Sequence, residues 1–270
     1  MIPSPFRRPL GMMHPRLQPL ARGVRTVERL VQWTLSEARF ASTSSTTSLQ
    51  HRVKRHQSVL RRKLGATDMQ LQEQKVQNLR CVIRALDGRL LRPGETLSFC
   101  RAVGPPLRIR GFVDGMQLSR GEAVVGVGGG MCQASNLLYW LTLHSELTIV
   151  ERHHHSFDPF PDDGRVLPYA SGATVLWPHR DLQVRNNTDD TFQIRMWLDD
   201  KCLNGDLRCD RRPRRSFSVF ERGHAFFVDD GVTYRRNELW RRVRVRDTGK
   251  HLAEEFIVAN CGEVKYDVHV

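Results

Sequence analysis

The sequence lacks any apolar run long enough to cross a lipid bilayer, because a spanning helix needs about 20 consecutive apolar residues. The longest candidate, residues 137–150, is interrupted by polar residues at 144–146. Arginines at positions 7 and 8 are followed by too little apolar sequence to form the core of a secretory signal. We therefore expect a cytoplasmic protein without a transmembrane segment.

Lysine is also scarce, since six of the 42 basic residues are lysine and the rest are arginine. The formal net charge of +13 at pH 7 favours anionic partners, such as nucleic acids, acidic membranes or polyanionic wall precursors. An arginine bias of this kind can also follow from codon composition alone. The basic clusters at 52–63 and 235–246 have no regular set of interleaved aromatic residues, which argues against nucleic-acid binding.

Cysteine is limited to six positions, 81, 100, 132, 202, 209 and 261. Without an export signal these residues are expected to be free thiols in a reducing compartment. Cys202 and Cys209 flank Asn204-Gly205, a dipeptide typical of a hairpin turn. A zinc site at this pair would need two further ligands, and none follows at finger-like spacing. We expect neither a metal ion nor a cofactor.

The spacing of apolar residues predicts an α+β fold. Three- and four-residue steps predict helices over 24–40, 67–88 and 131–144, and the basic segment 51–64 is interpreted as a further helix. Short strands are expected at 96–99, 111–116, 123–125 and 147–152, and at 173–177, 182–185, 192–198, 217–220, 225–228, 243–245 and 255–258. N-terminal helices thus precede a central unit of a cysteine-bearing helix and strands, and a C-terminal antiparallel β meander follows.

Three parts of the chain are expected. Residues 1–50 form a partly disordered N-terminal extension with one helix, residues 51–200 form the main domain, and residues 201–270 form a β-rich C-terminal extension. A tract rich in Ser and Thr at 41–48 is interpreted as the linker between the first two parts.

The run Gly128-Gly129-Gly130-Met131-Cys132 is the strongest candidate for chemistry. Cys132 is predicted to lie in the first turn of a helix, where free N–H groups and the helix dipole lower the pKa of a thiol. The glycines would let a substrate backbone approach closely and would supply N–H donors to an oxyanion. Gln133 follows and offers its side-chain amide to the same position.

A base for this thiol is offered by the cluster His153-His154-His155. In an extended segment His153 and His155 share one face, and His154 lies on the other. A third group usually orients such a histidine. The available carboxylates are those of Asp158, Asp162, Asp163, Asp181 and Glu151, and the sequence does not choose among them.

Two other interpretations of the same residues stay open. Cys132, His153 and His155 could together bind a metal ion, or the glycines could be structural and the histidines solvated. The glycine run has neither the terminal Gly-Lys-Ser/Thr of a phosphate-binding loop nor the spacing of a dinucleotide fingerprint.

Three motifs together resemble the VanW family. They are Pro93-Gly94-Glu95-Thr96-Leu97-Ser98-Phe99, the glycine–cysteine segment from Gly128 to Leu138, and Thr148-Ile149-Val150-Glu151-Arg152-His153-His154-His155-Ser156. The segments from His56 to Gly65 and from Phe157 to Asp162 are also similar to the family, so the resemblance covers residues 51–195.

This resemblance implies which residues matter more than it implies a reaction. Cys132, Gln133, His155, Ser156 and Glu95 fall on family motif positions. The first two residues of the histidine cluster fall where the family varies, which weakens a metal site, and the cysteine at position 100 departs from the family pattern. The family's association with glycopeptide resistance implies a role in cell-wall metabolism or its regulation.

Two hypotheses of function follow. In the first, the chain is a cysteine-dependent hydrolase or acyl transferase that acts on an amide or peptide of the cell wall. Its catalytic residues are the nucleophile Cys132, the base His155, Gln133 at the oxyanion, and Asp158 or Asp181 as the orienting group.

In the second hypothesis, the chain is a binding module without catalysis. An anionic or peptide ligand related to the cell wall would lie on the glycine loop, in a pocket lined by Gly128, Gly129, Gly130, Glu95, Arg152, His155 and Ser156. Both hypotheses name a small-molecule or peptide partner and no nucleic acid.

Overall fold

The computed structural model describes residues 18–61, 69–119, 122–154, 157–158, 161 and 166–268. The contacts divide the chain into two compact units, residues 1–38 and 39–270. The predicted division at residue 200 falls in the turn between two paired strands, β10 (Phe192–Leu198) and β11 (Cys202–Cys209).

The first unit contains helix α2, Gln18–Leu35. The predicted helix over 24–40 is confirmed in type, but it ends at Leu35. The hydroxyl of Thr34 donates to the carbonyl oxygen of Leu30 at 2.9 Å, and the guanidinium of Arg29 lies 5.4 Å from the centre of the Trp33 ring. These contacts join residues four apart, which are neighbours on a helix surface.

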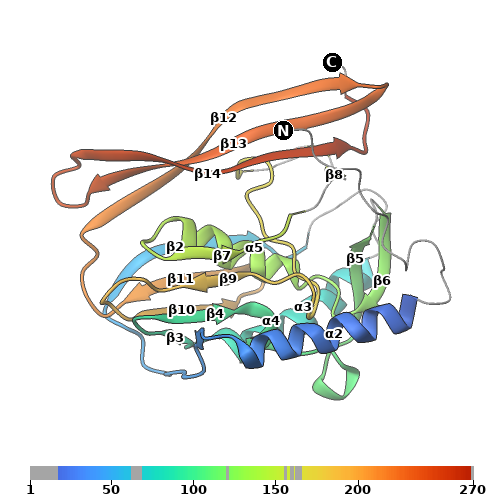
Figure 1. Ribbon diagram of the computed structural model, residues 1–270, viewed down its shortest axis with the longest axis horizontal. Coiled ribbons are helices and arrows are strands. Elements are labelled where there is room, and N and C mark those ends of the chain that lie inside the picture. Colours follow the sequence, from blue (N-terminus) through green and yellow to red (C-terminus); the bar gives the residue numbers. More distant parts are fainter. Residues whose placement is uncertain are drawn as a thin grey trace. The chain divides into compact units, whose positions relative to one another are not determined.

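Within the described residues, the second unit contains three four-stranded sheets and one two-stranded hairpin (Figure 1). The first sheet has the order β1 (Arg39–Phe40), β4 (Glu95–Ser98), β9 (Gln183–Arg185) and β7 (Thr148–Glu151). The second has the order β2 (His51–Val59), β11, β10 and β3 (Leu90–Leu91). The third combines β12 (Arg215–Asp229), β13 (Val232–Val245), β14 (His251–Val264) and β8 (Phe157–Asp158), and the hairpin pairs β5 (Asp114–Ser119) with β6 (Glu122–Val127).

The helices of the second unit are α3 (Met69–Leu86), α4 (Phe99–Val103) and α5 (Cys132–Leu143), together with the 3₁₀ turn η2 (Arg108–Arg110). This arrangement confirms the predicted α+β fold, with α3 and α5 close to their predicted bounds. No helix in the described residues combines the length and the apolar character that a bilayer crossing requires.

Helix α5 packs on the second sheet, and this contact explains a wrong prediction at Asn204-Gly205. Strand β11 continues through this dipeptide, and the turn before β11 lies at residues 199–201. A Cβ atom built on Gly205 would lie 3.0 Å from side-chain atoms of Leu137 and Leu141 of α5. The glycine is therefore used for the close approach of the helix to the strand and not for a turn.

The helix predicted over 51–64 is also wrong, because His51–Val59 forms strand β2. Arg55 points to one side of the sheet and binds Asp206 of β11, while His56 lies on the other side, 5.9 Å from Trp140 between ring centres. Because basic residues occupy both sides of β2, no apolar alternation marks the strand in the sequence.

The tract at 41–48 is not a free linker, since residues 41, 43 and 45 form backbone hydrogen bonds within the second unit. The side chain of Gln193 on β10 is fully buried beside the tract. Its amide nitrogen donates to the carbonyl oxygens of Ser45 and Thr47, both at 3.0 Å, and its oxygen accepts from the backbone N–H of Leu49 at 2.8 Å. Backbone groups of the tract thus form hydrogen bonds with a side chain far away in the sequence.

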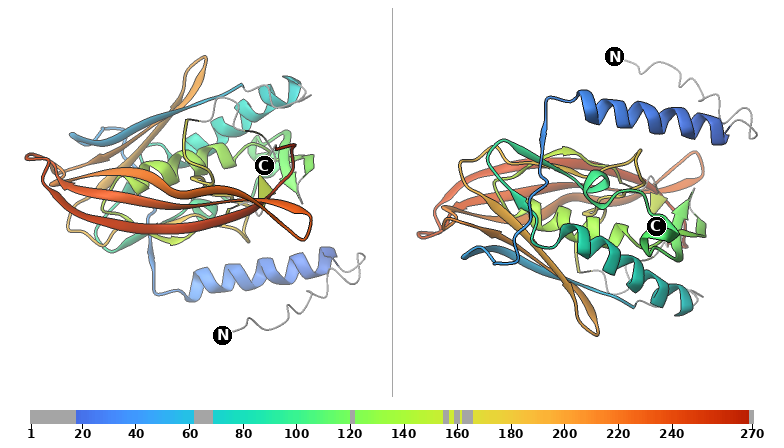
Figure 2. Two further views of the ribbon diagram at one scale, coloured as in Figure 1. Left: turned by 90° about the horizontal axis from the view of Figure 1, so that it is seen from above. Right: turned by 90° about the horizontal axis from the view of Figure 1, so that it is seen from below.

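The three long strands β12, β13 and β14 form an antiparallel ribbon, which confirms the predicted C-terminal meander (Figure 2). The two strands predicted at 217–220 and 225–228 are parts of β12, separated by a bulge. One face of the ribbon packs on the rest of the second unit through the buried Leu239 and Val243. Arg241 adds a polar contact there, because its guanidinium donates to the carbonyl oxygen of Ser145 just after α5, at 2.9 Å.

We expect Gln193→Leu to lower the free energy of unfolding by about 1–3 kcal/mol, because it leaves partly buried backbone groups of residues 45–49 without their partner. The amide hydrogens of residues 45–49 should also exchange faster. Chemical denaturation and hydrogen exchange measure the two effects. Gln57→Leu, at an exposed position of β2, is the control and should change the free energy by less than about 0.5 kcal/mol. Equal losses in both variants would contradict the role given to Gln193.

Candidate functional site

The glycine run forms a tight turn between β6 and α5, and helix α3 holds it in place. Gly128 and Gly130 have φ angles of 81° and 89°, which residues with a side chain rarely adopt. The amide nitrogen of Asn78 on α3 donates to the carbonyl oxygen of Gly129 at 2.9 Å. Asn78 also exchanges two hydrogen bonds with the backbone of Val113, so one buried side chain joins the run to the segment before β5.

The space beside each glycine is occupied by the chain itself. A Cβ atom built on Gly128 would lie 2.6 Å from Pro106, and one built on Gly130 would lie 2.1 Å from Lys75. At Gly129 the added atom would lie 2.1 Å from the backbone of Gly115. In this structure the three glycines therefore permit close packing of α3, β5 and the turn.

Cys132 is the first residue of α5, as predicted, and its thiol lies against the segment around Val175. The Sγ atom donates to the carbonyl oxygen of Val175 at 3.6 Å. Burial raises the pKa of the thiol, and the bond to Val175 and the charge of Arg180 only partly oppose this. The first backbone N–H groups of the helix are engaged in the turn, since Gln133 donates to Gly130 at 3.1 Å. A raised pKa leaves less thiolate at neutral pH, so the expected lowering is wrong.

Two further residues of the helix lie on the same face as Cys132 and hold the same segment of chain. Ser135 donates from its hydroxyl to the carbonyl oxygen of Ala173 at 2.6 Å, and the side-chain oxygen of Asn136 accepts from the backbone N–H of Ala173 at 2.8 Å. Residues at i, i+3 and i+4 share one face of a helix. The polar residues of this motif thus fasten Gly172–Val175 along the start of α5.

The side chain of Gln133 points away from the segment that Cys132 contacts and binds strand β2. Its amide nitrogen donates to the hydroxyl of Ser58 and to the carbonyl oxygen of Val59, both at 2.9 Å. These bonds tie α5 to the end of β2. The amide predicted to serve an oxyanion is therefore engaged with the second sheet in this structure.

The histidine cluster runs beside the segment that Cys132 binds. The backbone oxygen of His153 accepts from the backbone N–H of Thr174 at 2.8 Å. The ring atom Nε2 of His153 lies 2.9 Å from a carboxylate oxygen of Glu151. Burial lowers the pKa of His154, and the nearby positive groups of Arg152, His153 and Arg180 lower it further. His155 and Ser156 lie outside the described residues, so the pairing of Cys132 with His155 stays a prediction.

Two carboxylates considered as orienting groups, Glu151 and Asp181, belong to one hydrogen-bonded network. Glu151 accepts from the backbone N–H of Asp181 at 3.2 Å and from the side chain of Gln183 at 2.9 Å. Asp181 in turn accepts from the hydroxyl of Ser98 at 2.5 Å and from the backbone N–H of Cys100 at 2.7 Å. Burial raises the pKa of Asp181, and the hydrogen bonds from Ser98 and Cys100, which act to lower it, only partly oppose this. Ser98 caps α4, so the network fixes the start of that helix.

Asp158, the other predicted orienting group, lies with the ribbon. Its carboxylate accepts from the guanidinium of Arg235 at 3.0 Å and from the hydroxyl of Tyr266 at 2.9 Å. Both Asp158 and Arg235 are almost completely buried. Asp158 thus forms a buried ion pair that fastens β8 to β13 within the third sheet.

Two predicted binding residues also have structural partners. The guanidinium of Arg152 donates to the carbonyl oxygens of Gly172 and Ala170 and lies 4.9 Å from the centre of the Tyr139 ring. The buried carboxylate of Glu95 accepts from the backbone N–H of Arg92 at 2.9 Å and closes the turn before β4. In this structure both side chains are thus held by other parts of the chain.

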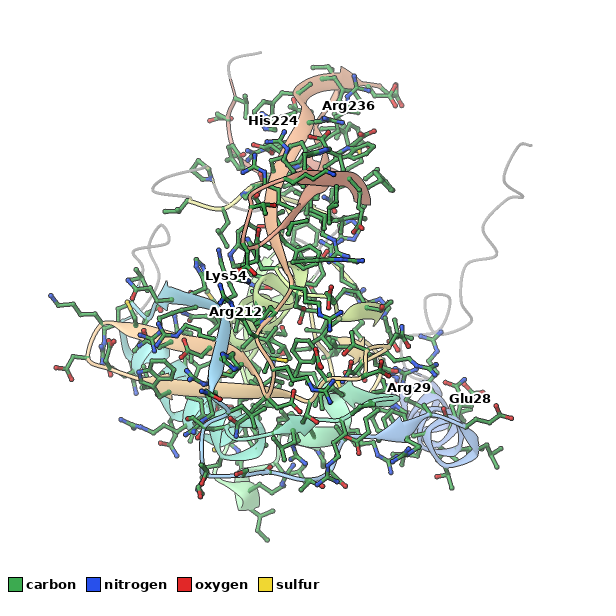
Figure 3. The ribbon with its side chains drawn as sticks, turned by 90° about the vertical axis from the view of Figure 1, so that its left-hand side faces the viewer. Glu28, Arg29, Lys54, Arg212, His224 and Arg236 are labelled. Atoms are coloured by element: carbon green, nitrogen blue, oxygen red, sulfur yellow. The ribbon has the colours of Figure 1, made fainter. Side chains whose placement is uncertain are left out.

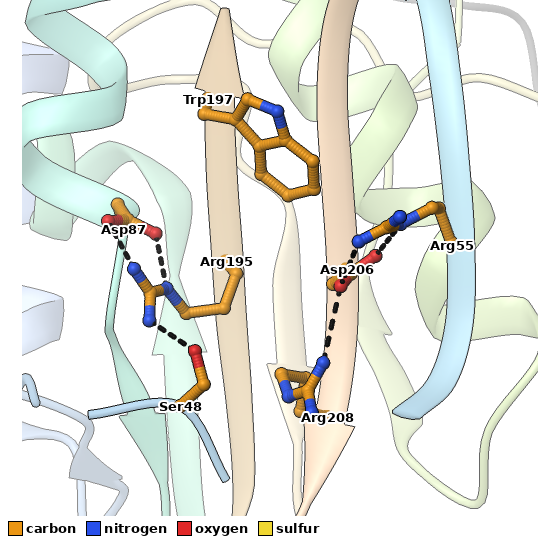
Figure 4. Close-up of a pocket in the computed structure, with 7 residues that line it drawn as sticks. All are labelled: Ser48, Arg55, Asp87, Arg195, Trp197, Asp206 and Arg208. Carbon is orange, nitrogen blue, oxygen red and sulfur yellow. Dashed lines mark hydrogen bonds and ion pairs between the residues drawn. The ribbon is translucent and has the colours of Figure 1, made fainter. Parts of the chain in front are cut away.

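A second candidate site is a cavity of about 260 Å³ on the polar face of the second sheet. It is lined by residues from β2, β10, β11, the end of α3 and the tract that Gln193 holds: Ser48, Arg55, Asp87, Arg195, Trp197, Asp206 and Arg208 (Figure 4). The strand register places these polar side chains together, because Asp206 pairs with Arg195 on one side and with Arg55 on the other. The sequence analysis missed this site, and the polar residues that alternate along β10 are its one signal.

Ion pairs organise this cavity around two carboxylates. The side chain of Asp206, which is 4% exposed, forms ion pairs with Arg55 at 2.6 Å, Arg52 at 3.3 Å and Arg208 at 3.4 Å. Burial works to raise the pKa of Asp206, but its arginine neighbours outweigh burial and lower it. The second pair joins Arg195 to Asp87 at 2.8 Å. Four arginines thus face two aspartates, which leaves a surplus of positive charge.

Metal binding finds no support in the part of the chain that the structure describes. No three side chains of His, Cys, Asp or Glu gather there closely enough to hold an ion.

Comparisons with known proteins agree with the sequence motifs. The model of a protein family described as "VanW like protein" matches residues 74–208. The chain is 34% identical over 199 residues to the vancomycin B-type resistance protein VanW of Enterococcus faecalis. The matched region covers 74% of this chain and 72% of that protein. The chain is also 33% identical over 119 residues to the uncharacterized protein YoaR of Bacillus subtilis. That matched region covers 44% of this chain and 37% of that protein. No solved structure matches the chain.

We expect iodoacetamide to alkylate Cys132 of the folded protein more slowly than free cysteine near neutral pH, because burial raises the pKa of this thiol and the thiolate is the reacting form. Cys261, which is exposed, should react faster and serves as the internal control. Peptide mapping by mass spectrometry measures both rates, and unfolding the protein should remove the difference. Alkylation of Cys132 faster than free cysteine would show an activated nucleophile.

Proposed function

Because the chain belongs to the VanW family, which includes a vancomycin B-type resistance protein, we propose that it acts in cell-wall metabolism by binding an anionic ligand. The binding site of this proposal is the cavity on the second sheet. Five of its seven lining residues, from Asp87 to Arg208, lie within the region that the family model matches.

The observation that carries this proposal is the surplus of positive charge around Asp206. Within the described residues, Arg55 uses Nε and one terminal nitrogen on this carboxylate, which leaves its other terminal nitrogen free to donate. A guanidinium of this kind favours a carboxylate or phosphate, to which hydrogen bonds are about twice as strong as those between neutral groups. Trp197 forms a flat wall beside Arg55, whose guanidinium carbon lies 5.2 Å from the ring centre.

The volume of the cavity limits what it can hold. Pockets for whole drug-sized ligands occupy about 300–1,000 Å³, and this cavity has about 260 Å³. It therefore suits the charged end of a larger molecule, such as a peptide-bearing wall fragment, and leaves the remainder of that molecule on the surface.

Binding is favoured over cysteine chemistry by what holds the start of α5. Cys132, Gln133, Ser135 and Asn136 each bind another part of the chain. A side chain that fixes the fold in this way is not poised to attack a substrate.

The cysteine-dependent hydrolase or acyl transferase remains a second candidate, and one observation favours it. The positive charge of Arg180 acts to lower the pKa of Cys132, and the same charge acts on His154 of the neighbouring cluster. In this mechanism Cys132 would be the nucleophile, His155 the base and Asp181 the orienting group.

The binding proposal predicts that Arg55→Gln and Trp197→Ala each weaken binding of muropeptides with free carboxylates by about tenfold or more, because each removes a direct contact with the ligand. Isothermal titration calorimetry measures the dissociation constant, and amidated muropeptides should bind weakly to all forms. Arg185→Gln, an exposed arginine on β9, is the matched control and should bind as the wild type does.

Cys132→Ala separates the two candidates. It should retain binding within about twofold if the cavity is the site, and it should abolish any release of amide or peptide products if the cysteine is the nucleophile. Wild-type affinity in the Arg55 and Trp197 variants would overturn the binding proposal, and product release that depends on Cys132 would establish the hydrolase.

A further inference from the structure

One end of the ribbon carries a group of basic side chains, here called the basic end: Arg214, Arg244, Arg246 and Lys250. Strand β12 begins there, β13 ends there and β14 begins there. Backbone bonds join these residues closely, since Arg246 donates to the carbonyl oxygen of Arg214 and Val245 donates to that of Lys250, both at 2.9 Å. Arg244 lies opposite His251 in the strand pairing.

The basic end differs from its surroundings in having no acidic partner. The arginines next to it are paired, Arg212 with Asp247 at 2.5 Å and Arg215 with Glu146 at 3.4 Å. In the part of the chain that the structure describes, Arg214, Arg244, Arg246 and Lys250 form no ion pair, and all but Arg246 are exposed. The charges of Arg214, Arg244 and Lys250 are therefore available to an external anion.

Exposed apolar side chains lie on the ribbon beside this basic end. Leu252, the extra residue of a bulge in β14, is 46% exposed, and Phe256 is 53% exposed. Phe256 pairs across the ribbon with Trp240, with the two rings in edge contact at 5.4 Å between centres. Trp240 and Arg244 lie on the same face of β13, four residues and thus about 13 Å apart. Basic and apolar groups are combined on one face within a short distance.

We infer that this face docks on an anionic lipid bilayer. Each Lys or Arg near such a surface gains from the negative potential of the lipid phosphates. Aromatic side chains such as Trp240 and Phe256 prefer the level of the head groups, where one part of the ring is apolar and the surroundings are wet. Four cations without an ion pair, flanked by the exposed Leu252 and Phe256 and the half-buried Trp240, combine both requirements.

The geometry favours a bilayer over a nucleic acid. Binding to single strands needs free ring faces on which bases stack. Here the guanidinium of Arg222 lies 4.8 Å from the centre of the Trp240 ring and 5.1 Å from that of Phe220, and Arg242 lies 5.2 Å from Phe220. Arginines thus already lie over the Trp240 and Phe220 rings. A second copy of the chain would bring the same positive charge to the contact and is disfavoured.

The ribbon offers a matched control for the basic end. Arg236 is an exposed arginine on the same face of β13, over the Phe227 ring at 5.4 Å. It lies eight residues from Arg244, and thus about 27 Å away along the strand. Figure 3 labels Arg236 on the ribbon and Arg212 in the segment just before β12.

Sedimentation of the full chain with lipid vesicles tests this inference. The wild type should bind vesicles of phosphatidylcholine containing phosphatidylglycerol, and it should bind pure phosphatidylcholine weakly. The combined variant Arg214→Gln, Arg244→Gln and Lys250→Gln should partition about a hundredfold more weakly. Phe256→Ser should partition about tenfold more weakly, and Arg236→Gln should stay within about twofold of the wild type. Circular dichroism and thermal unfolding should be unchanged in every variant, since all the sites are exposed.

Four results would overturn the inference. The first is equal binding to charged and neutral vesicles, and the second is wild-type binding by the combined variant. The third is an equal loss in the combined variant and in Arg236→Gln, which would assign the effect to net charge alone. Binding of a single-stranded oligonucleotide together with no binding of vesicles would identify a different polyanion and would equally reject the bilayer. None of these measurements depends on the cavity, which lies on a different sheet.

Discussion

The first turn of α5 is the constraint on which the centre of the structure depends. Cys132, Ser135 and Asn136 hold the segment 172–175 on one side, and Gln133 holds the end of β2 on another. The glycines before the helix let α3 and β5 approach the same turn without a side chain between them. A run of small and polar residues thus joins parts of the chain that are far apart in sequence, and this accounts for a motif that otherwise suggests an active site.

This constraint bears directly on the chemistry of Cys132. Each unit by which burial raises the pKa of a thiol makes its ionisation about 1.4 kcal/mol more costly. Arg180 compensates only partly, because burial remains the largest cause of the shift. The bond from Cys132 to Val175 belongs to the same contact between the segment 172–175 and the helix as the hydrogen bonds of Ser135 and Asn136.

Local patterns in the sequence predicted much of the fold, whereas tertiary partners decided the rest. The helix over 131–144 follows from a dense run of apolar residues that the fold buries on almost all sides. The strand at 192–198 follows from alternation, because one side of it is apolar. Gly205 was misassigned to a turn because its partners, Leu137 and Leu141, are about 65 residues away in the chain and only the packed structure reveals them. Cys132 was placed correctly at a helix start, but the direction of its pKa shift depends on burial, which spacing does not report.

The cavity and the basic end differ in how their charges are balanced, and this difference matters more than the net charge of +13. Many arginines of this chain act as structural donors, such as Arg152 on backbone oxygens and Arg235 on the buried Asp158. Such arginines add to the formal charge but offer little to a partner. In the cavity one carboxylate is shared by three guanidinium groups, so the surplus is confined to a small volume that suits a single charged group. At the end of the ribbon the cations are spread over an open surface, where an extended array of phosphates can meet them together.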